Sequence, residues 1–238
     1  MGSAVASFAD TLTISGSTTF NAVVMVPHQK EIEAATGHKL VVTPNRTELG
    51  VELLLEHHAD LAMISTSLDA VAKVLRKNNP NLPLDQLVEV EVLRQRVAFT
   101  VNPSNPVRSI PSDKLRKVLL GEITNWKELG GRDVPIRIVM VDTGAGIPLA
   151  VASQLLQGKP VTTVNAIRVR IGSQTAKVVE QEPGAFGLTQ ANNVPGHNIV
   201  EIKIDSPVEQ RLSYVTLGAP SGAVRSVIEA TRKILAAE

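Results

Sequence analysis

Cysteine is absent from the 238 residues, and aromatic residues make up only 3% of them. Without cysteine there is no disulfide framework, no thiolate nucleophile and no cysteine-based metal site. The scarcity of Phe, Tyr and Trp disfavours ligands that are held by ring stacking, such as sugars, nucleobases or quaternary amines. A small polar or anionic ligand suits this composition better.

Neither sign of charge dominates, and long apolar runs are lacking. The 24 Lys and Arg residues face 23 Asp and Glu residues, and like charges are not gathered as a nucleic-acid-binding surface requires. No apolar run approaches the roughly 20 residues of a membrane span. Met1-Gly2-Ser3 lacks the basic and apolar regions of a secretory signal. We therefore expect a globular protein with no nucleic-acid partner and no direct membrane span.

The order of apolar runs predicts an α/β fold. Strands followed by a polar loop and a helix are expected at residues 12–15, 38–43, 60–64, 136–141 and 166–171. The helix expected after the first strand contains Pro27, which argues against one uninterrupted helix there. Alternating strands and helices predict parallel sheets that bind ligands at the carboxyl ends of the strands. Two such sets predict two α/β lobes with a ligand cleft between them.

Five of the expected strand-to-helix loops are rich in hydroxyl groups, glycine or amides. They comprise residues 16–19, 45–47, 65–67, 142–146 and 173–175. The first N–H groups of a helix are unpaired and lie at the positive end of its dipole, so such loops can hold an oxyanion without any formal charge. For each loop the alternative is that Ser or Thr merely caps its own helix. Five loops together favour anion binding.

Two charged residues stand out in these loops. The guanidinium of Arg46 could clamp a carboxylate or phosphate with two hydrogen bonds, although a solvated surface arginine is the alternative. The carboxylate of Asp142 could accept a hydrogen bond from a protonated oxyanion or a ligand hydroxyl, or else cap a helix.

Catalytic machinery is not visible in the sequence. His57 and His58 have no partners at the spacing of a metal site, and no G-x-S-x-G, Walker or H-E-x-x-H motif occurs. We therefore expect no enzymatic activity, no cofactor and no metal.

Several motifs together carry a family resemblance. AFTVNPSNPV (98–107), followed by LRKVLLGEITNWKELGG (115–131), resembles the signature of the phosphate-binding, PstS-like family of ABC-transporter substrate-binding proteins. Supporting motifs are ISGSTTF (14–20), ADLAMISTSL (59–68), PIRIVMVDTGAG (135–146) and PGAFGLT (183–189). The resemblance implies a two-lobe type II periplasmic-binding-protein fold. Lobe 1 is expected to comprise residues 1–98 and 190–238, and lobe 2 residues 99–189.

The resemblance also implies where a ligand binds. In the family, contacts come from the first glycine–hydroxyl loop, the hydroxyls after the third strand and a second-lobe loop of the form R-x-x-G-S-G-T. Together with the loop analysis, this gives the expected ligand-binding residues Ser17, Thr18, Thr19, Arg46, Ser65, Thr66, Ser67, Asp142, Thr143, Gly144, Ala145, Gly146 and Thr175.

The second-lobe loop departs from the family pattern. Met140 and Val141 stand where the arginine is expected, Ala145 takes the serine place and Ile147 the threonine place. A charge and two hydroxyls are lost, each worth about 1–3 kcal/mol. Arg46 is expected to replace the missing cation, and Ala145 and Ile147 to offer a less polar wall. Such a cleft would suit a small organic acid or phosphoester at least as well as inorganic phosphate.

The sequence thus predicts an extracytoplasmic solute-binding protein that delivers a small anion, either a phosphate-like oxyanion or a small organic acid, to the membrane permease of an ABC transporter. A periplasmic or extracytoplasmic location implies that a signal peptide has been removed. The alternative is a ligand-sensing regulatory domain, for which a cytoplasmic location is possible, that uses the same cleft to switch a signalling partner.

Overall fold

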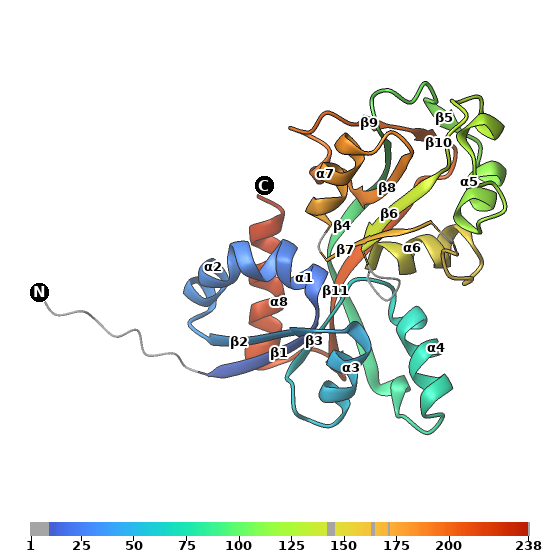
Figure 1. Cartoon of the computed structure of the whole chain (residues 1–238). Coiled ribbons are helices and arrows are strands. Elements are labelled where there is room, and N and C mark those ends of the chain that lie inside the picture. Colours follow the sequence, from blue (N-terminus) through green and yellow to red (C-terminus); the bar gives the residue numbers. More distant parts are fainter. Residues whose placement is uncertain (1–9, 142–145, 163–164, 171, 238) are drawn as a thin grey trace, which may run out of the picture. The chain divides into compact units, whose positions relative to one another are not determined.

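The computed structural model describes residues 10–141, 146–162, 165–170 and 172–237, which form two compact α/β units (Figure 1). Unit 1 comprises the described residues up to Arg94 and from Arg211 onward, and unit 2 comprises Gln95–Gln210. Residues 95–98 and 190–210, which we expected in the first lobe, therefore lie in unit 2. Strands β4 (Leu87–Val101) and β11 (Glu209–Leu217) each contribute residues to both units.

Unit 1 is built on parallel strands covered by helices. Its strands run in the order β2-β1-β3-β11, where β1 pairs parallel with β2 and β3, and β11 is antiparallel to β3. Besides β11, the strands are β1 (Thr11–Ser17), β2 (Lys39–Asn45) and β3 (Leu61–Ile64). The helices are α1 (Thr18–Phe20), α2 (Val26–Thr36), α3 (Thr47–Leu55), α4 (Leu68–Asn78) and α8 (Gly222–Leu235), with a short 3-10 helix at Leu84–Gln86.

The two faces of this sheet are both buried. Alternate residues of a strand point to opposite faces. Leu61 and Met63 of β3 accordingly pack into the core formed with α2 and α8, whereas Ala62 and Ile64 pack into the core formed with α3 and α4. Because both faces are covered, β3 is an uninterrupted apolar run.

The helix after β1 continues past Pro27, but not as a regular α-helix. Between α1 and α2 the chain makes a π-helical turn (Asn21–Met25), in which the N–H of Val26 donates to the carbonyl of Asn21. Pro27 follows at the second position of α2. Its missing N–H thus falls where the hydrogen-bond pattern changes from five-residue to four-residue spacing, so the interruption that we expected is a change of helix type.

Unit 2 repeats this architecture with a different strand order, β4-β8-β6-β7. Strand β6 is parallel to β7 and β8, β8 is antiparallel to β4, and β9 pairs with β4. The strands are β6 (Arg137–Val141), β7 (Ile167–Val169), β8 (Ala185–Gln190) and β9 (Val200–Glu201), with a separate parallel pair of β5 (Ser109–Ile110) and β10 (Lys203–Ile204). The helices are α5 (Ser112–Leu119), α6 (Gly146–Leu155) and α7 (Ser173–Gln181), with 3-10 helices at Trp126–Leu129 and Ala191–Asn193.

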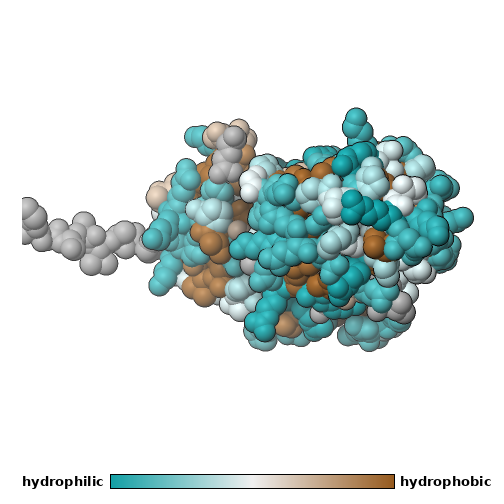
Figure 2. All heavy atoms as spheres, turned by 45° about the horizontal axis from the view of Figure 1, so that its top comes forward, coloured by the Kyte–Doolittle hydropathy of each residue, from teal (hydrophilic) through white to brown (hydrophobic). Residues whose placement is uncertain are grey.

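Hydrophobic residues at the surface are scattered. On the face shown in Figure 2 they lie in separate groups among hydrophilic residues. The exposed large hydrophobic side chains in the described ranges are Val26, Val41, Val74 and Val88. In the same ranges, no helix is both long enough and apolar enough to cross a bilayer.

Candidate functional site

Three of the predicted polar loops meet at one edge of unit 1. Because β1, β2 and β3 are parallel, their carboxyl ends lie at the same edge of the sheet. The register places Ser17 opposite Asn45 and Gly16 opposite Met63. Residues 17–19, 45–47 and 65–67 follow directly from these strand ends, so the fold brings these three loops together.

Two glycines allow this close approach. Gly16 has a φ of 126°, and a Cβ on it would overlap the carbonyl oxygen of Met63 in β3. A Cβ on Gly50 of α3 would lie 2.5 Å from the Cα of Gly16. Helix α3 therefore packs with its backbone directly against the end of β1, which holds the loop containing Arg46 beside Ser17.

The hydroxyl groups at this edge differ in their hydrogen bonds and in their exposure. The Oγ of Ser17 accepts a hydrogen bond from the N–H of Phe20 at 3.2 Å, and the Oγ of Ser67 accepts one from the N–H of Ala70 at 3.3 Å. Both serines thus cap helices, yet each keeps its own proton to donate. Thr18 is exposed and Thr19 is half-buried, and neither hydroxyl bonds to a described residue. Ser65 and Thr66 are buried.

Arg46 is a cation without a partner among the residues that the structure describes. It is the exposed N-cap residue of α3, its side chain makes no capping bond, and its guanidinium forms no hydrogen bond or ion pair within the described residues. The preceding Asn45 donates from Nδ2 to the Oγ of Ser15 at 2.7 Å, which in turn donates to the carbonyl of Thr43 at 3.3 Å. This network fixes the backbone directly before Arg46.

A carboxylate that the sequence analysis missed reaches the same edge. Glu89, near the start of β4, accepts a hydrogen bond at Oε2 from the N–H of Leu68 at 2.9 Å. Its Oε1 accepts one from the Oγ of Ser213 in β11 at 2.8 Å. Leu68 is the first residue of α4, so Glu89 takes the leading N–H of a helix that we expected to face a ligand. Because Glu89 is far from Leu68 along the chain, no local sequence pattern indicates this contact.

In unit 2, two of the six predicted ligand-binding residues, Gly146 and Thr175, can be placed. Asp142, Thr143, Gly144 and Ala145 lie outside the described residues. Gly146 begins α6 and is buried, directly after the carboxyl end of β6. Ile147 is only 2% exposed and belongs to the hydrophobic core of this unit. Its side chain is therefore a core side chain here, whereas we expected it to help form a less polar wall.

Thr175 is enclosed by unit 2 itself. It lies in the first turn of α7, it is fully buried, and its Oγ1 has no hydrogen-bond partner within the ranges that the structure describes. A Cβ on Gly187 of β8 would lie 3.0 Å from its methyl group, which shows that the side chain packs against this strand.

Beside α7, a chain of carboxamides that sequence reasoning missed follows the carboxyl end of β8. Asn193 Nδ2 donates to Gln190 Oε1 at 2.9 Å, and Gln190 Nε2 donates to Gln210 Oε1 at 3.3 Å. Asn193 Nδ2 also donates to the hydroxyl of Thr189, which bonds the carbonyl of Gly172 at 3.2 Å. Unit 2 thus presents neutral amide groups at the edge where its parallel strands end.

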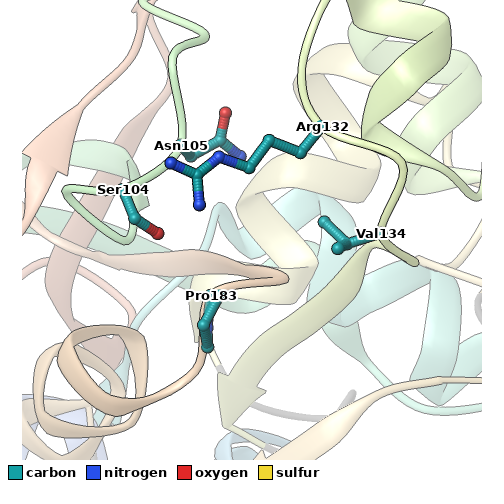
Figure 3. A pocket seen from close by; sticks show the side chains of 5 residues that line it. All are labelled: Ser104, Asn105, Arg132, Val134 and Pro183. Atoms are coloured by element: carbon teal, nitrogen blue, oxygen red, sulfur yellow. The ribbon is translucent and has the colours of Figure 1, made fainter.

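A small pocket lies at the opposite edge of unit 2. It is lined by Ser104, Asn105, Arg132, Val134 and Pro183 (Figure 3). Val134 and Pro183 precede β6 and β8, and Ser104 follows β4, which is antiparallel to β8. The guanidinium of Arg132 extends toward Ser104 and Asn105 and has no partner among the described residues. This pocket is separate from the strand ends at which we expected ligands.

Ionisable groups in the described parts of the chain do not form a metal site: no three His, Asp or Glu side chains there are grouped to hold an ion. His58 pairs only with Glu56, at 3.4 Å.

Two α/β units joined by strands that run through both, each with polar loops at the carboxyl ends of its parallel strands, define the class of two-lobe periplasmic-binding-protein folds. Residues 2–231 match the family model of the PBP superfamily domain, and the chain belongs to this superfamily.

The relatives agree with this assignment. The chain is 25% identical over 194 residues to the phosphate-binding protein PstS of Bacillus subtilis (strain 168), a match that covers 82% of this chain and 61% of that protein. The chain thus spans less than two thirds of the length of this relative. An ABC-type phosphate transport receptor from Vibrio cholerae has the same fold, with a TM-score of 0.76 at 20% identity and 95% of each chain covered. So does the regulatory domain of MetR, a LysR family regulator from N. meningitidis, with a TM-score of 0.67 at 14% identity, covering 96% of this chain and 95% of that one.

Proposed function

We propose that this protein is an extracytoplasmic solute-binding protein of an ABC transporter, and that it binds a small anion. The observation that carries the proposal is the convergence of three polar loops at one edge of unit 1. One of these loops holds the guanidinium of Arg46, which has no partner in the described part of the chain. The phosphate-binding protein and the phosphate transport receptor named above support a transported oxyanion. This proposed role implies a membrane permease as the partner. It also implies that a signal peptide has been removed from the mature protein.

The proposed binding uses hydrogen bonds and one charge. Hydroxyl protons of Ser17, Thr18, Thr19 and Thr66 would point to the oxygens of the anion, and the guanidinium of Arg46 would supply the positive charge. In unit 2, the segment 142–146 is proposed to contribute further donors at the start of α6. No bond is made or broken, which fits a protein that carries its ligand and does not convert it.

A second candidate is a ligand-sensing regulatory domain. It is favoured by the regulatory domain that shares this fold. The two functions differ in their partners: a permease and an ATPase encoded beside this protein would support transport, whereas a DNA-binding or kinase partner would support sensing.

Arg46→Ala tests the site directly. We expect isothermal titration calorimetry with phosphate, sulfate and small carboxylates to find an anion that the native protein binds and that the variant binds about 10- to 100-fold more weakly, because a charge-assisted hydrogen bond contributes about 1.5–3 kcal/mol. The same anion should raise the melting temperature of the native protein.

Arg132→Ala is the matched control, since Arg132 is also an exposed arginine without a partner in the described chain, but lies in the pocket at the opposite edge of unit 2. It should bind the anion as the native protein does. Failure of every anion to bind would refute the proposed function, and equal losses in both variants would remove Arg46 from the site.

A further inference from the structure

The start of α4 already carries an anion, the side chain of Glu89. Its two carboxylate oxygens bond the N–H of Leu68 and the hydroxyl of Ser213 at 2.9 and 2.8 Å. Ser213 is fully buried and belongs to β11, while Glu89 belongs to β4. The carboxylate therefore links the leading residue of α4 to two neighbouring strands, and this fixes its position.

Both partners of Glu89 are neutral, so its charge is not compensated. Two cations on the strands that hold Glu89 and Ser213 are engaged elsewhere: Arg94 of β4 donates twice to Glu91 at 2.9 Å, and Arg211 of β11 lies 3.5 Å from Glu91. The hydrogen bonds from Arg94 hold the pKa of Glu91 below its ordinary value. Within the described residues no Lys, Arg or His pairs with Glu89, and the first turn of α4 adds another carboxylate, that of Asp69.

This charge lies beside the predicted ligand loop. Leu68 follows Ser67 directly, so a ligand held by residues 65–67 meets the negative potential of Glu89 at the helix start where we expected positive potential. A carboxylate only accepts hydrogen bonds. A ligand group next to it is favoured when it donates a proton and disfavoured when it is itself ionised.

We propose that Glu89 is a specificity-determining residue of the unit 1 site. It selects small organic anions of single charge that carry a hydroxyl or ammonium group, and it disfavours fully ionised oxyanions such as sulfate. This inference rests on the proposed anion-binding function and narrows its substrate class. The anionic end of such a ligand lies toward Arg46, and its donor group lies toward the start of α4.

The test compares matched probes. Lactate and propionate differ by one hydroxyl, and sulfate has a double charge and no proton to donate at neutral pH. For the native protein we expect lactate to bind about tenfold more tightly than propionate, the effect of one hydrogen bond to a charged acceptor. In Glu89→Gln this preference should shrink, because the amide oxygen is a neutral and weaker acceptor. Sulfate affinity should rise by about tenfold as the repulsion is removed.

Two further variants separate charge from structure. Glu91→Gln removes the same charge two residues along the same strand, where arginines compensate it, and should leave the probe preferences unchanged. Glu89→Asp keeps the charge and should retain the native preference even if it lowers stability. Anion binding with the same lactate-to-propionate ratio and the same sulfate affinity in Glu89→Gln as in the native protein would overturn the inference alone. A native protein that binds no anion would overturn the proposed function as well.

Discussion

Replacing Gly16 by alanine is expected to lower the free energy of unfolding of unit 1 by about 3 kcal/mol, at the upper end of what overpacking costs. A Cβ at this position overlaps the carbonyl of Met63, which is held in the pairing of β1 with β3. On its other side, α3 packs against the Cα of Gly16 through Gly50. The obstacles are backbone atoms, which cannot turn away as a side chain can. The φ of 126° adds strain for any residue with a Cβ.

Gly37→Ala provides the control for this prediction. Gly37 also has a positive φ, 71°, but nothing lies within 4 Å of a Cβ built on it. Gly37→Ala should lower the free energy of unfolding by about 1–2 kcal/mol, which is the cost of a left-handed backbone conformation for a residue with a Cβ. Urea unfolding curves for both variants, followed by far-ultraviolet circular dichroism, measure the difference. Equal losses would show that the contact between β1 and β3 does not require glycine. Because Gly16 precedes Ser17, we also expect Gly16→Ala to weaken anion binding.

The fold could be predicted because its elements follow from short-range patterns. The apolar run at 60–64 predicted a buried strand, which the structure shows as β3, and the run at 136–141 predicted β6. A strand buried on both faces needs no information from distant residues to be recognised. Pro27 predicted that the helix after β1 is not one uninterrupted α-helix, and the structure confirms this, but the sequence pattern did not predict that the interruption is a π-helical turn.

The candidate site was predicted only as far as its loops. Arg46 and Ser67 could be proposed as site residues because Arg46 directly follows β2 and Ser67 ends the loop after β3, and strand ends of a parallel sheet share an edge. Glu89 could not be found in this way, because its contacts with Leu68 and Ser213 depend on tertiary structure. A single sequence, taken alone, carries no signal for contacts between residues so far apart along the chain. The same holds for the carboxamides that join Gln190 to Gln210.

Trp126→Ala is expected to destabilise unit 2 by about 3–5 kcal/mol, as large-to-small changes at buried aromatic positions do. Trp126 is fully buried, its Nε1–H donates to the carbonyl of Gly184 at 3.0 Å, and its ring meets Phe186 edge to face at 5.7 Å. Phe186 in turn stacks on Phe99 of β4 at 5.8 Å. The side chain thus joins the turn before β8 to the strands of the sheet. Alanine would leave a cavity and remove one of two hydrogen bonds to the carbonyl of Gly184, which also accepts from the N–H of Arg137 at 2.9 Å.

Trp126→Phe separates these two effects. Phenylalanine fills most of the space but cannot donate to Gly184, so we expect it to cost about 1–2 kcal/mol, chiefly for the lost hydrogen bond. Because Trp126 is the only tryptophan, urea unfolding of both variants must be followed by far-ultraviolet circular dichroism. A loss below about 1 kcal/mol for Trp126→Ala would contradict the prediction, since a buried side chain of this size cannot be removed so cheaply unless the surrounding residues collapse into its place. In that case the segment 115–131, which contains Trp126, would determine the conformation of the loops before β6 and β8 without stabilising unit 2.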